Sequence, residues 1–232
     1  MRDGSGKALQ IGDIAYDRDP SYGYTVYISE DGAFAPYLVL ARNYGGSVLL
    51  LREEPLEAPM AYNDYAGYYE GSSIDAYLCG SFLDSLQPEV KGSIRDSEIT
   101  ITAESSLGVA GSDVKTIVRK VFLLSYTEIG QASSSVANVE GRALKYFKEP
   151  SHVIAYKGGE AASWWLRTSY TWYGNSAWGV GPEGSLGGGA VYEPNGIRPA
   201  FCVDGSLRIA EGGDSADGAD GFYVDVEEGG GR

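Results

Sequence analysis

Histidine and cysteine are almost missing from this sequence: one histidine, His152, and two cysteines, Cys79 and Cys202, stand among its 232 residues. A catalytic triad or a cysteine–histidine dyad would have to use His152, and nothing near it in the sequence singles it out. Neither cysteine lies in a CxxC motif, so we expect no metal and no cofactor. Two buried free thiols are the simpler interpretation, and a single disulfide is the alternative for an exported protein.

Long apolar runs are missing too, and basic residues are few. No apolar stretch approaches the roughly 20 residues that span a bilayer, and the first residues, Met1–Gly6, show no signal-peptide core. Lysine and arginine number 18 against 32 acidic residues, so the net charge is −14, which repels nucleic acid and anionic membranes. We expect a soluble chain that binds a protein or a glycan. Its oligomeric state and location are left open, with a virion or a cell surface as candidates.

The composition predicts one folded domain. Hydrophobic residues make up 43% of the chain, which excludes wholesale disorder, and a chain of this length buries a core without disulfide or metal support. Tyrosine is unusually frequent, with 18 residues against 6 phenylalanines. Its apolar ring and polar hydroxyl suit a half-exposed binding surface, although tyrosine is also common in strands.

Several segments have the pattern of strands. Residues 22–29 alternate with a period of two. Two apolar runs, 38–40 and 48–51, flank the turn sequence Asn43–Ser47 and predict a β-hairpin. The glycine-rich stretch 183–189 indicates turns. Further strands are expected at 99–102, 121–125 and 197–203.

Two helices are expected. Ser72 or Ser73 can cap the first, and its apolar residues fall on one stripe. These residues are Ile74, Tyr77, Leu78 and Phe82. The second helix is expected over Val139–Lys148, with Leu144 and Phe147 facing inward and Pro150 ending it.

The elements together predict a single α+β domain over residues 1–210. Residues 211–232 form an acidic, glycine-rich tail in which Phe222–Val224 is a candidate strand. Three short motifs indicate nothing more than loops or solvated surface. Gly4–Lys7 lacks the upstream glycine and strand of a phosphate-binding loop, and adjacent acids such as Glu53-Glu54 do not define a glycosidase pair. Glu193-Pro194-Asn195 resembles a sugar-binding motif of calcium-dependent lectins, but its Trp-Asn-Asp partner is missing.

An aromatic and polar cluster is the strongest candidate for a site. Two tryptophans and two tyrosines fall within nine residues, interleaved with glycine, asparagine and serine, so they cannot all be core. Rigid aromatic anchors among adaptable polar groups are typical of a paratope. The alternative is a glycine-rich loop folded over its own hydrophobic cluster. The candidate ligand-binding residues are Tyr170, Thr171, Trp172, Tyr173, Asn175, Ser176, Trp178, Tyr192, Glu193 and Asn195.

The order of several motifs resembles a bacterial and phage domain family of the DUF6273 type. The segment Arg119–Glu128 resembles its DKVFLLS…E element, and the other elements follow in order along the chain from about Gly12 to Val203. They are the helix around Ile74–Phe82, Ala143–Phe147, Trp164–Thr168, Gly179–Gly181, Gly184–Leu186 and Gly196–Phe201.

The W-L-R…G…G-I-R-P skeleton is also similar to the formylglycine-generating-enzyme branch of the C-type lectin fold, which includes the variable proteins of diversity-generating retroelements. This resemblance implies a C-type-lectin-like domain of short antiparallel sheets, two helices and a long loop-rich segment at 164–201 that displays ligand-binding residues. It implies display by Tyr170–Trp178 and Tyr192–Asn195. The scaffold residues would be Trp164, Leu166, Arg167, Gly184, Arg198 and Pro199.

The resemblance stops short of an activity. Oxidase members of that branch use a cysteine pair near the C-terminus, whereas Cys202 has no cysteine near it in the sequence. We therefore expect a non-enzymatic binding protein of the receptor or adhesin kind, the variable protein of a diversity-generating retroelement. The alternatives are an enzyme on the same fold, with turnover that depends on His152 or Cys202, and a structural subunit of a virion or cell surface.

Overall fold

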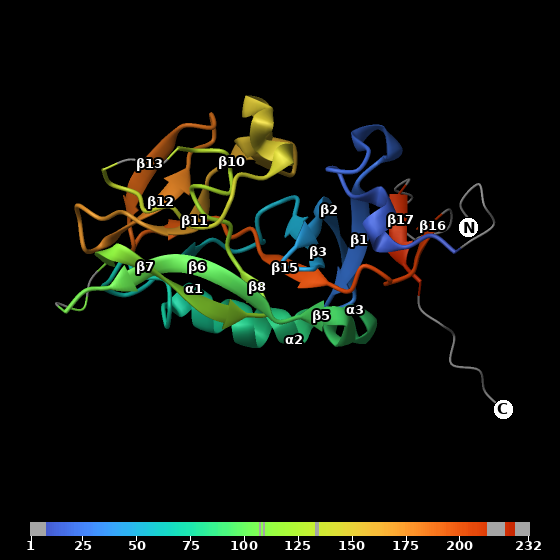
Figure 1. The fold of residues 1–232 in the computed structure, drawn as a ribbon, viewed down its shortest axis with the longest axis horizontal. Helices are drawn as coiled ribbons and strands as arrows, with labels where there is room; N and C mark the ends of the chain where they lie inside the picture. Colours follow the sequence, from blue (N-terminus) through green and yellow to red (C-terminus); the bar gives the residue numbers. More distant parts are fainter. Residues whose placement is uncertain (1–7, 107, 109, 133–134, 213–220, 226–232) are drawn as a thin grey trace.

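A computed structural model describes residues 8–106, 108, 110–132, 135–212 and 221–225. Its largest element is a curled mixed sheet of eight strands in the order β16-β17-β1-β2-β3-β15-β5, with β8 also pairing β15 (Figure 1). The strand β1 runs parallel to β17, and the other pairs are antiparallel. These strands are β1 (Thr25–Glu30), β2 (Ala33–Tyr44), β3 (Ser47–Arg52), β5 (Ile94–Arg95), β8 (Val121–Phe122), β15 (Ala200–Val203), β16 (Ile209–Gly212) and β17 (Gly221–Val224).

The hairpin expected from the two apolar runs is confirmed. The strands β2 and β3 pair around Gly45-Gly46, and Tyr44 faces Ser47 across the turn. Val48, Leu49, Leu50 and Leu51 are all buried, because β3 lies in the interior of the sheet between β2 and β15. Burial on both faces explains why this strand is continuously apolar.

The first expected helix is confirmed as well. It runs as α1 (Ser73–Tyr77), one π-helical turn (Leu78–Phe82) and α2 (Leu83–Ser85). The Ser72 hydroxyl caps it by accepting a hydrogen bond from the Asp75 amide at 3.2 Å. The short helix α3 (Pro88–Ser93) follows.

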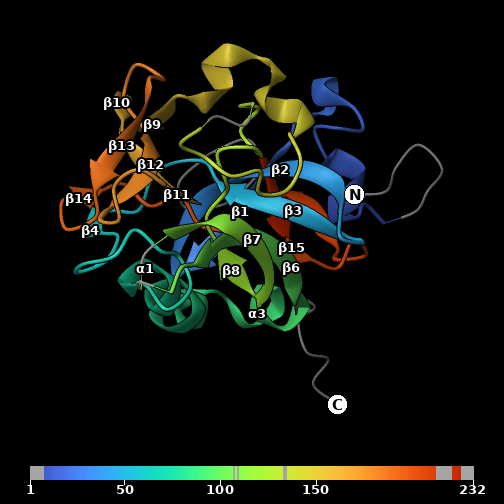
Figure 2. The same cartoon turned by 60° about the vertical axis from the view of Figure 1, so that its left-hand side comes forward.

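A long hairpin of β6 (Ser97–Glu104) and β7 (Ala110–Arg119) runs along these helices (Figures 1 and 2). The guanidinium of Arg119 on β7 joins the two layers, since its Nε lies 2.7 Å from the buried carboxylate of Asp75 on α1.

The remaining strands form smaller sheets, which Figure 2 shows to one side of the main sheet. The antiparallel sheet β11-β12-β13 is the largest of them. The strands are β11 (Trp164–Ser169), β12 (Ser176–Val180), β13 (Leu186–Ala190), the pair β9 (Ala155–Lys157) and β10 (Glu160–Ala162), and the pair β4 (Met60–Ala61) and β14 (Pro194–Asn195). Short 3₁₀ helices occupy Ile11–Ile14, Pro20–Tyr22, Lys145–Lys148 and Pro150–Val153.

The expected α+β class, on a C-type-lectin-like plan of short antiparallel sheets with two helices, is wrong. The described residues are mostly β, with 44% in strands and 16% in helices. They form a curled mixed sheet, and among them only the continuous stretch Ser73–Ser85 makes a helix of seven or more residues. The second expected helix, over Val139–Lys148, is absent apart from one 3₁₀ turn at Lys145–Lys148. The Glu140 amide donates to Thr127 Oγ1 at 3.0 Å and the Leu144 amide donates to the Glu128 carbonyl at 3.0 Å, so distant partners replace the local bonds of a helix.

The glycine-rich stretch also differs from expectation. Part of it forms strand β13 rather than turns. A Cβ on Gly189 would lie 2.8 Å from the Trp165 ring, and one on Gly188 would lie 2.7 Å from the Tyr170 ring. The glycines therefore let two aromatic rings lie directly on the strand.

The end of the chain continues the main sheet. Residue 211, where the tail was expected to begin, lies inside β16, and the Phe222–Val224 segment belongs to β17. The rest of the expected tail, 213–220 and 226–232, lies outside the described residues. Both cysteines are free thiols; Cys202 is buried, whereas Cys79 is exposed, contrary to the expectation that both are buried.

Candidate functional site

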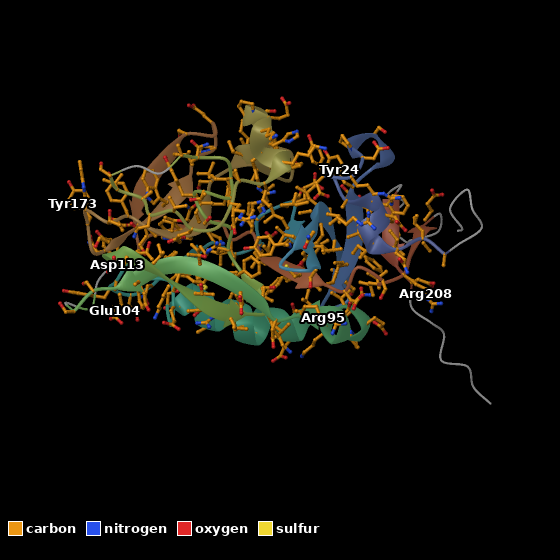
Figure 3. All side chains as sticks on the ribbon, in the orientation of Figure 1. Tyr24, Arg95, Glu104, Asp113, Tyr173 and Arg208 are labelled. Carbon is orange, nitrogen blue, oxygen red and sulfur yellow. The ribbon has the colours of Figure 1, made fainter. Side chains whose placement is uncertain are left out.

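Most of the candidate residues lie on two loops beside the small sheet, whereas Ser176 and Trp178 lie in β12 and Asn195 lies in β14. Residues 170–175 connect β11 to β12, and residues 191–193 connect β13 to β14. Three large aromatic side chains on these loops are exposed: Trp172 (66%), Tyr173 (61%) and Tyr192 (57%). Asn175 and Glu193 are exposed beside them. Figure 3 shows Tyr173 at one end of the long axis of the molecule.

A third loop joins them. Tyr65, on the loop between β4 and α1, is 85% exposed. The Gly67 amide donates to the Gly174 carbonyl at 2.8 Å, and a Cβ on Gly67 would lie 2.1 Å from the Ser176 carbonyl oxygen. Only glycine allows this approach, so the loop that carries Tyr65 is seated against the loop that carries Trp172 and Tyr173.

Backbone hydrogen bonds hold the three loops together. The Val191 amide donates to the Asn175 carbonyl at 3.0 Å, and the Asn63 amide donates to the Val191 carbonyl at 3.1 Å. The ring of Tyr173 stacks on Tyr170 with their centroids 5.8 Å apart. We call the four exposed rings of Tyr65, Trp172, Tyr173 and Tyr192 the aromatic display surface. Hydrogen bonds fix the backbone of the loops that carry these rings, and the rings themselves face solvent.

Trp178, by contrast, is a buried residue of the small sheet that packs beneath the exposed loops. It is only 7% exposed, its ring lies 4.4 Å from Tyr126 and 5.0 Å from Tyr170, and its Nε1 donates to the Val136 carbonyl at 3.1 Å. The expectation that Trp178 is displayed is therefore corrected. It lies in strand β12, where Tyr126, Tyr170 and the Val136 carbonyl contact its ring.

The smaller polar candidates are also engaged in structure. Asn195 Oδ1 accepts hydrogen bonds from Ser163 Oγ at 2.6 Å and from the Gly196 amide at 2.8 Å, so this side chain fixes a turn. Ser176 is half-buried at the start of β12, and its amide donates to Tyr173. Thr171 bonds the 135–136 segment through its amide and hydroxyl.

A buried ionic cluster lies beneath this region. Arg167 on β11 forms a two-pronged pair with Glu128, at 2.6 and 2.9 Å, and all of these side chains are fully buried. Glu140 lies 3.8 Å from the same guanidinium and accepts bonds from Thr102 and Thr168. One cation thus serves two carboxylates, and burial raises the pKa of Glu140. The expectation that Arg167 is scaffold fits this geometry.

The candidate catalytic residues are poorly placed for nucleophilic chemistry. Burial raises the pKa of Cys202 to about 12, so its reactive thiolate is suppressed. His152 Nδ1 lies 2.8 Å from the Tyr146 carbonyl, which can only accept, so this nitrogen carries the proton. Within the described residues, no three side chains of the metal-ligating types come together. None of the described helices has the length and apolar character to cross a bilayer.

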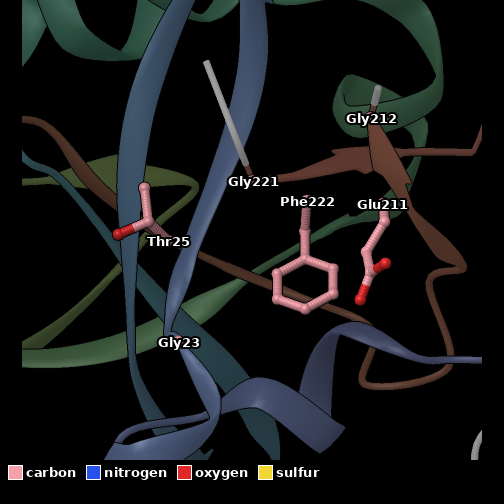
Figure 4. Close-up of a pocket in the computed structure, with 6 residues that line it drawn as sticks. All are labelled: Gly23, Thr25, Glu211, Gly212, Gly221 and Phe222. Atoms are coloured by element: carbon pink, nitrogen blue, oxygen red, sulfur yellow. The ribbon is translucent and has the colours of Figure 1, made fainter. Parts of the chain in front are cut away.

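Two hollows stand apart from the aromatic display surface. One, of about 490 Å³, is lined by Gly23, Thr25, Glu211, Gly212, Gly221 and Phe222. Figure 4 shows the Glu211 carboxylate beside the Phe222 ring there. Two of its lining residues, Gly212 and Gly221, are the last and first described residues on either side of 213–220 in the sequence. The other, of about 500 Å³, contains Arg198 and His152. Sequence reasoning missed it, because its residues come from distant segments.

Comparison with known proteins yields one family. The model of a family described as "Domain of unknown function (DUF6273)" matches residues 45–205, from the β2–β3 turn to the end of β15. No curated protein and no solved structure matches the chain.

Proposed function

We propose, for a chain that belongs to the DUF6273 family, a function as a non-enzymatic binding protein that captures a protein or glycan ligand through the aromatic display surface. The observation that carries this proposal is the exposure of four large aromatic side chains on three loops joined by backbone hydrogen bonds. Single exposed apolar residues are ordinary on protein surfaces, whereas a cluster marks an interaction site.

The side chains suit binding energetically. Tryptophan and tyrosine dominate interface hot spots, where truncation of one anchor costs about 2 kcal/mol or more. They have few rotatable bonds, so little entropy is lost when they are immobilised. The hydrogen bonds of Gly67, Val191 and Asn63 order the loops in advance, which reduces the entropy cost of binding further.

A finer proposal concerns variation. We propose that the exposed positions of residues 164–201 are diversified, as in the variable proteins of diversity-generating retroelements. The support is the motif resemblance together with the placement of Trp172, Tyr173 and Tyr192, which can be exchanged without disturbing the core. Sequencing the gene locus tests this step. A second, near-identical copy of the 164–201 coding segment beside a reverse transcriptase, differing mainly at adenines, would support it, and a locus without such a copy would refute it.

The test of binding uses two libraries. A phage library of random peptides is panned on the immobilised protein, and the labelled protein is applied to a glycan array. We expect selected peptides or glycans to lose at least tenfold in affinity toward a Trp172→Ala/Tyr173→Ala double variant that still unfolds cooperatively. The matched control is Phe34→Ala, because Phe34 is an aromatic residue that is 45% exposed on β2, in the main sheet. Ligands that bind the double variant as tightly as the wild type, or libraries that yield none, would refute the proposal.

A further inference from the structure

A second concave site lies on the other side of the small sheet from the exposed loops. It has a volume of about 500 Å³, within the range of ordinary small-molecule pockets. Its walls come from β1 and β2, the segment after β3, the 3₁₀ helix Pro150–Val153 and β9. Figure 3 shows that Tyr24, in its wall, lies far along the molecule from Tyr173, so this pocket is separate from the aromatic display surface.

Arg198 supplies the unusual feature of the pocket. This side chain is only 2% exposed. Within the described part of the chain its one hydrogen bond runs from Nε to the Arg52 carbonyl at 3.1 Å, and Nη1 has no partner. The guanidinium lies over the Trp164 ring at 4.7 Å, and burial lowers its pKa to about 10. A buried cation without a directly paired anion is costly, so a carboxylate bound in the pocket beside Arg198 would be favoured.

Glu53 lines the same pocket without pairing with Arg198. Among the described residues, its half-buried carboxylate has no hydrogen bond or ion pair. Burial raises its pKa, and the nearby Arg198 opposes the rise. A ligand group beside Glu53 therefore has to donate hydrogen bonds. The hydroxyl of Ser151 and the ring of His152 add further polar partners along the wall.

Aromatic rings form the rest of the lining. Tyr24 and Tyr146 lie 5.8 Å apart in an edge-to-face arrangement, and Tyr146 stacks on His152 at 4.1 Å. Tyr27 and Tyr156 complete the set. Rings with polar tips can contact the C–H face of a sugar while their hydroxyls bond its oxygens.

We propose that this pocket binds an acidic saccharide, whose carboxylate pairs with Arg198, whose hydroxyls donate to Glu53 and whose ring packs on the tyrosines. A neutral sugar would leave Arg198 without a counter-charge. A phosphate or a simple dicarboxylate would meet the carboxylates of Glu53 and Glu54 with no donor to offer. A free amino acid could answer both charges, but it has no set of hydroxyls to donate to Glu53 and to the polar tips of the tyrosines.

Calorimetric titration with named sugars tests the ligand class. The probes are glucuronate, galacturonate and N-acetylneuraminate, with glucose as the neutral sugar and leucine as the zwitterion. We expect at least one acidic sugar to bind at least tenfold more tightly than glucose and leucine. Tighter binding of leucine or glucose, or no binding of any acidic sugar, would overturn the proposal.

Two variants locate the site. Arg198→Lys keeps the charge but loses the planar fork that grips a carboxylate, so acidic-sugar affinity should fall at least tenfold. If that variant does not fold, Tyr156→Ala serves, because its side chain is half-exposed and its loss should weaken binding at least threefold without changing stability. The matched control is Tyr192→Ala, 57% exposed on the aromatic display surface, which should bind acidic sugar like the wild type. Wild-type affinity in the pocket variants would overturn the assignment, whatever the display surface binds.

Discussion

Two tryptophans six residues apart provide the sharpest test of how the small sheet is built. Trp172 is 66% exposed, whereas Trp178 is 7% exposed between Tyr126 and Tyr170. Alanine at position 178 removes a buried ring and the hydrogen bond from Nε1 to the Val136 carbonyl. Alanine at position 172 removes a ring that mostly contacts water. The same substitution should therefore lower the stability of the fold strongly at position 178 and hardly at all at position 172.

The magnitudes follow from burial. A buried Trp→Ala change costs about 3–5 kcal/mol through lost burial and cavity formation, and the broken hydrogen bond accounts for roughly 1 kcal/mol of that range. For a chain of this length, each kcal/mol lowers Tm by roughly 2–4 °C, so Trp178→Ala should lower Tm by roughly 6–20 °C. Trp172→Ala should change the free energy of unfolding by no more than about 0.5 kcal/mol.

Urea unfolding followed by far-UV circular dichroism measures both variants, because that signal comes mainly from the backbone and does not require the tryptophan that is removed as a fluorescent reporter. Trp178→Phe is the intermediate control, since it keeps a ring but loses the hydrogen bond. Equal losses of stability in Trp172→Ala and Trp178→Ala would refute the division into displayed and supporting tryptophans, and so would a Trp178→Ala protein as stable as the wild type.

Three further predictions use other parts of the structure. Gly67→Ala should cost at least about 2 kcal/mol in urea unfolding, because its Cβ would lie 2.1 Å from the Ser176 carbonyl; wild-type stability would show that the two loops are not in contact. The raised pKa of Glu140 means that the native state binds the extra proton between the unfolded value near 4.5 and the folded value. Its contribution to the free energy of unfolding should therefore decline as pH rises through that window, and the difference between the unfolding free energies of wild type and Glu140→Gln should show this slope; a difference independent of pH would contradict it. Titration with a thiol reagent should modify one cysteine per native chain, Cys79, and the second, Cys202, only on unfolding; two fast thiols in the native protein would contradict the buried position of Cys202.

The strands and helices that could be predicted from the sequence are those fixed by residues close together in the chain. The hairpin around Gly45-Gly46 and the helix capped by Ser72 rest on short-range turn and capping chemistry, and the structure has both. The helix expected over Val139–Lys148 failed because the Glu140 carboxylate is drawn to Thr102 and Thr168. Such contacts between distant segments leave no periodic trace in the sequence.

The same limit applies to the sites. Composition alone pointed to the loop of Trp172 and Tyr173, but it could not separate Trp172 from Trp178, since one lies in a turn and the other in strand β12. Asparagine is typical of binding loops, and yet the Asn195 side chain accepts hydrogen bonds from Ser163 and Gly196 and so stabilises a turn. The pocket gave almost no signal in the sequence, because Arg198 and the acidic pair Glu53-Glu54 lie in distant segments of the chain. An arginine inside the apolar run Gly196–Phe201, with no acidic residue beside it, was the only hint.

The order of strands in the main sheet has a consequence for folding during synthesis. The strands β1, β2 and β3 can pair as soon as they are made, but the partner that covers the other edge of β3 is β15, which pairs Leu51 with Ala200. At typical rates of about 5–20 residues per second, the apolar edge of β3 waits roughly 7–30 s for that strand to emerge. The display loops are made within this interval, before the sheet can close. A nascent chain that stalls ahead of β15 therefore exposes an unpaired apolar strand, and it should depend on chaperones to avoid aggregation.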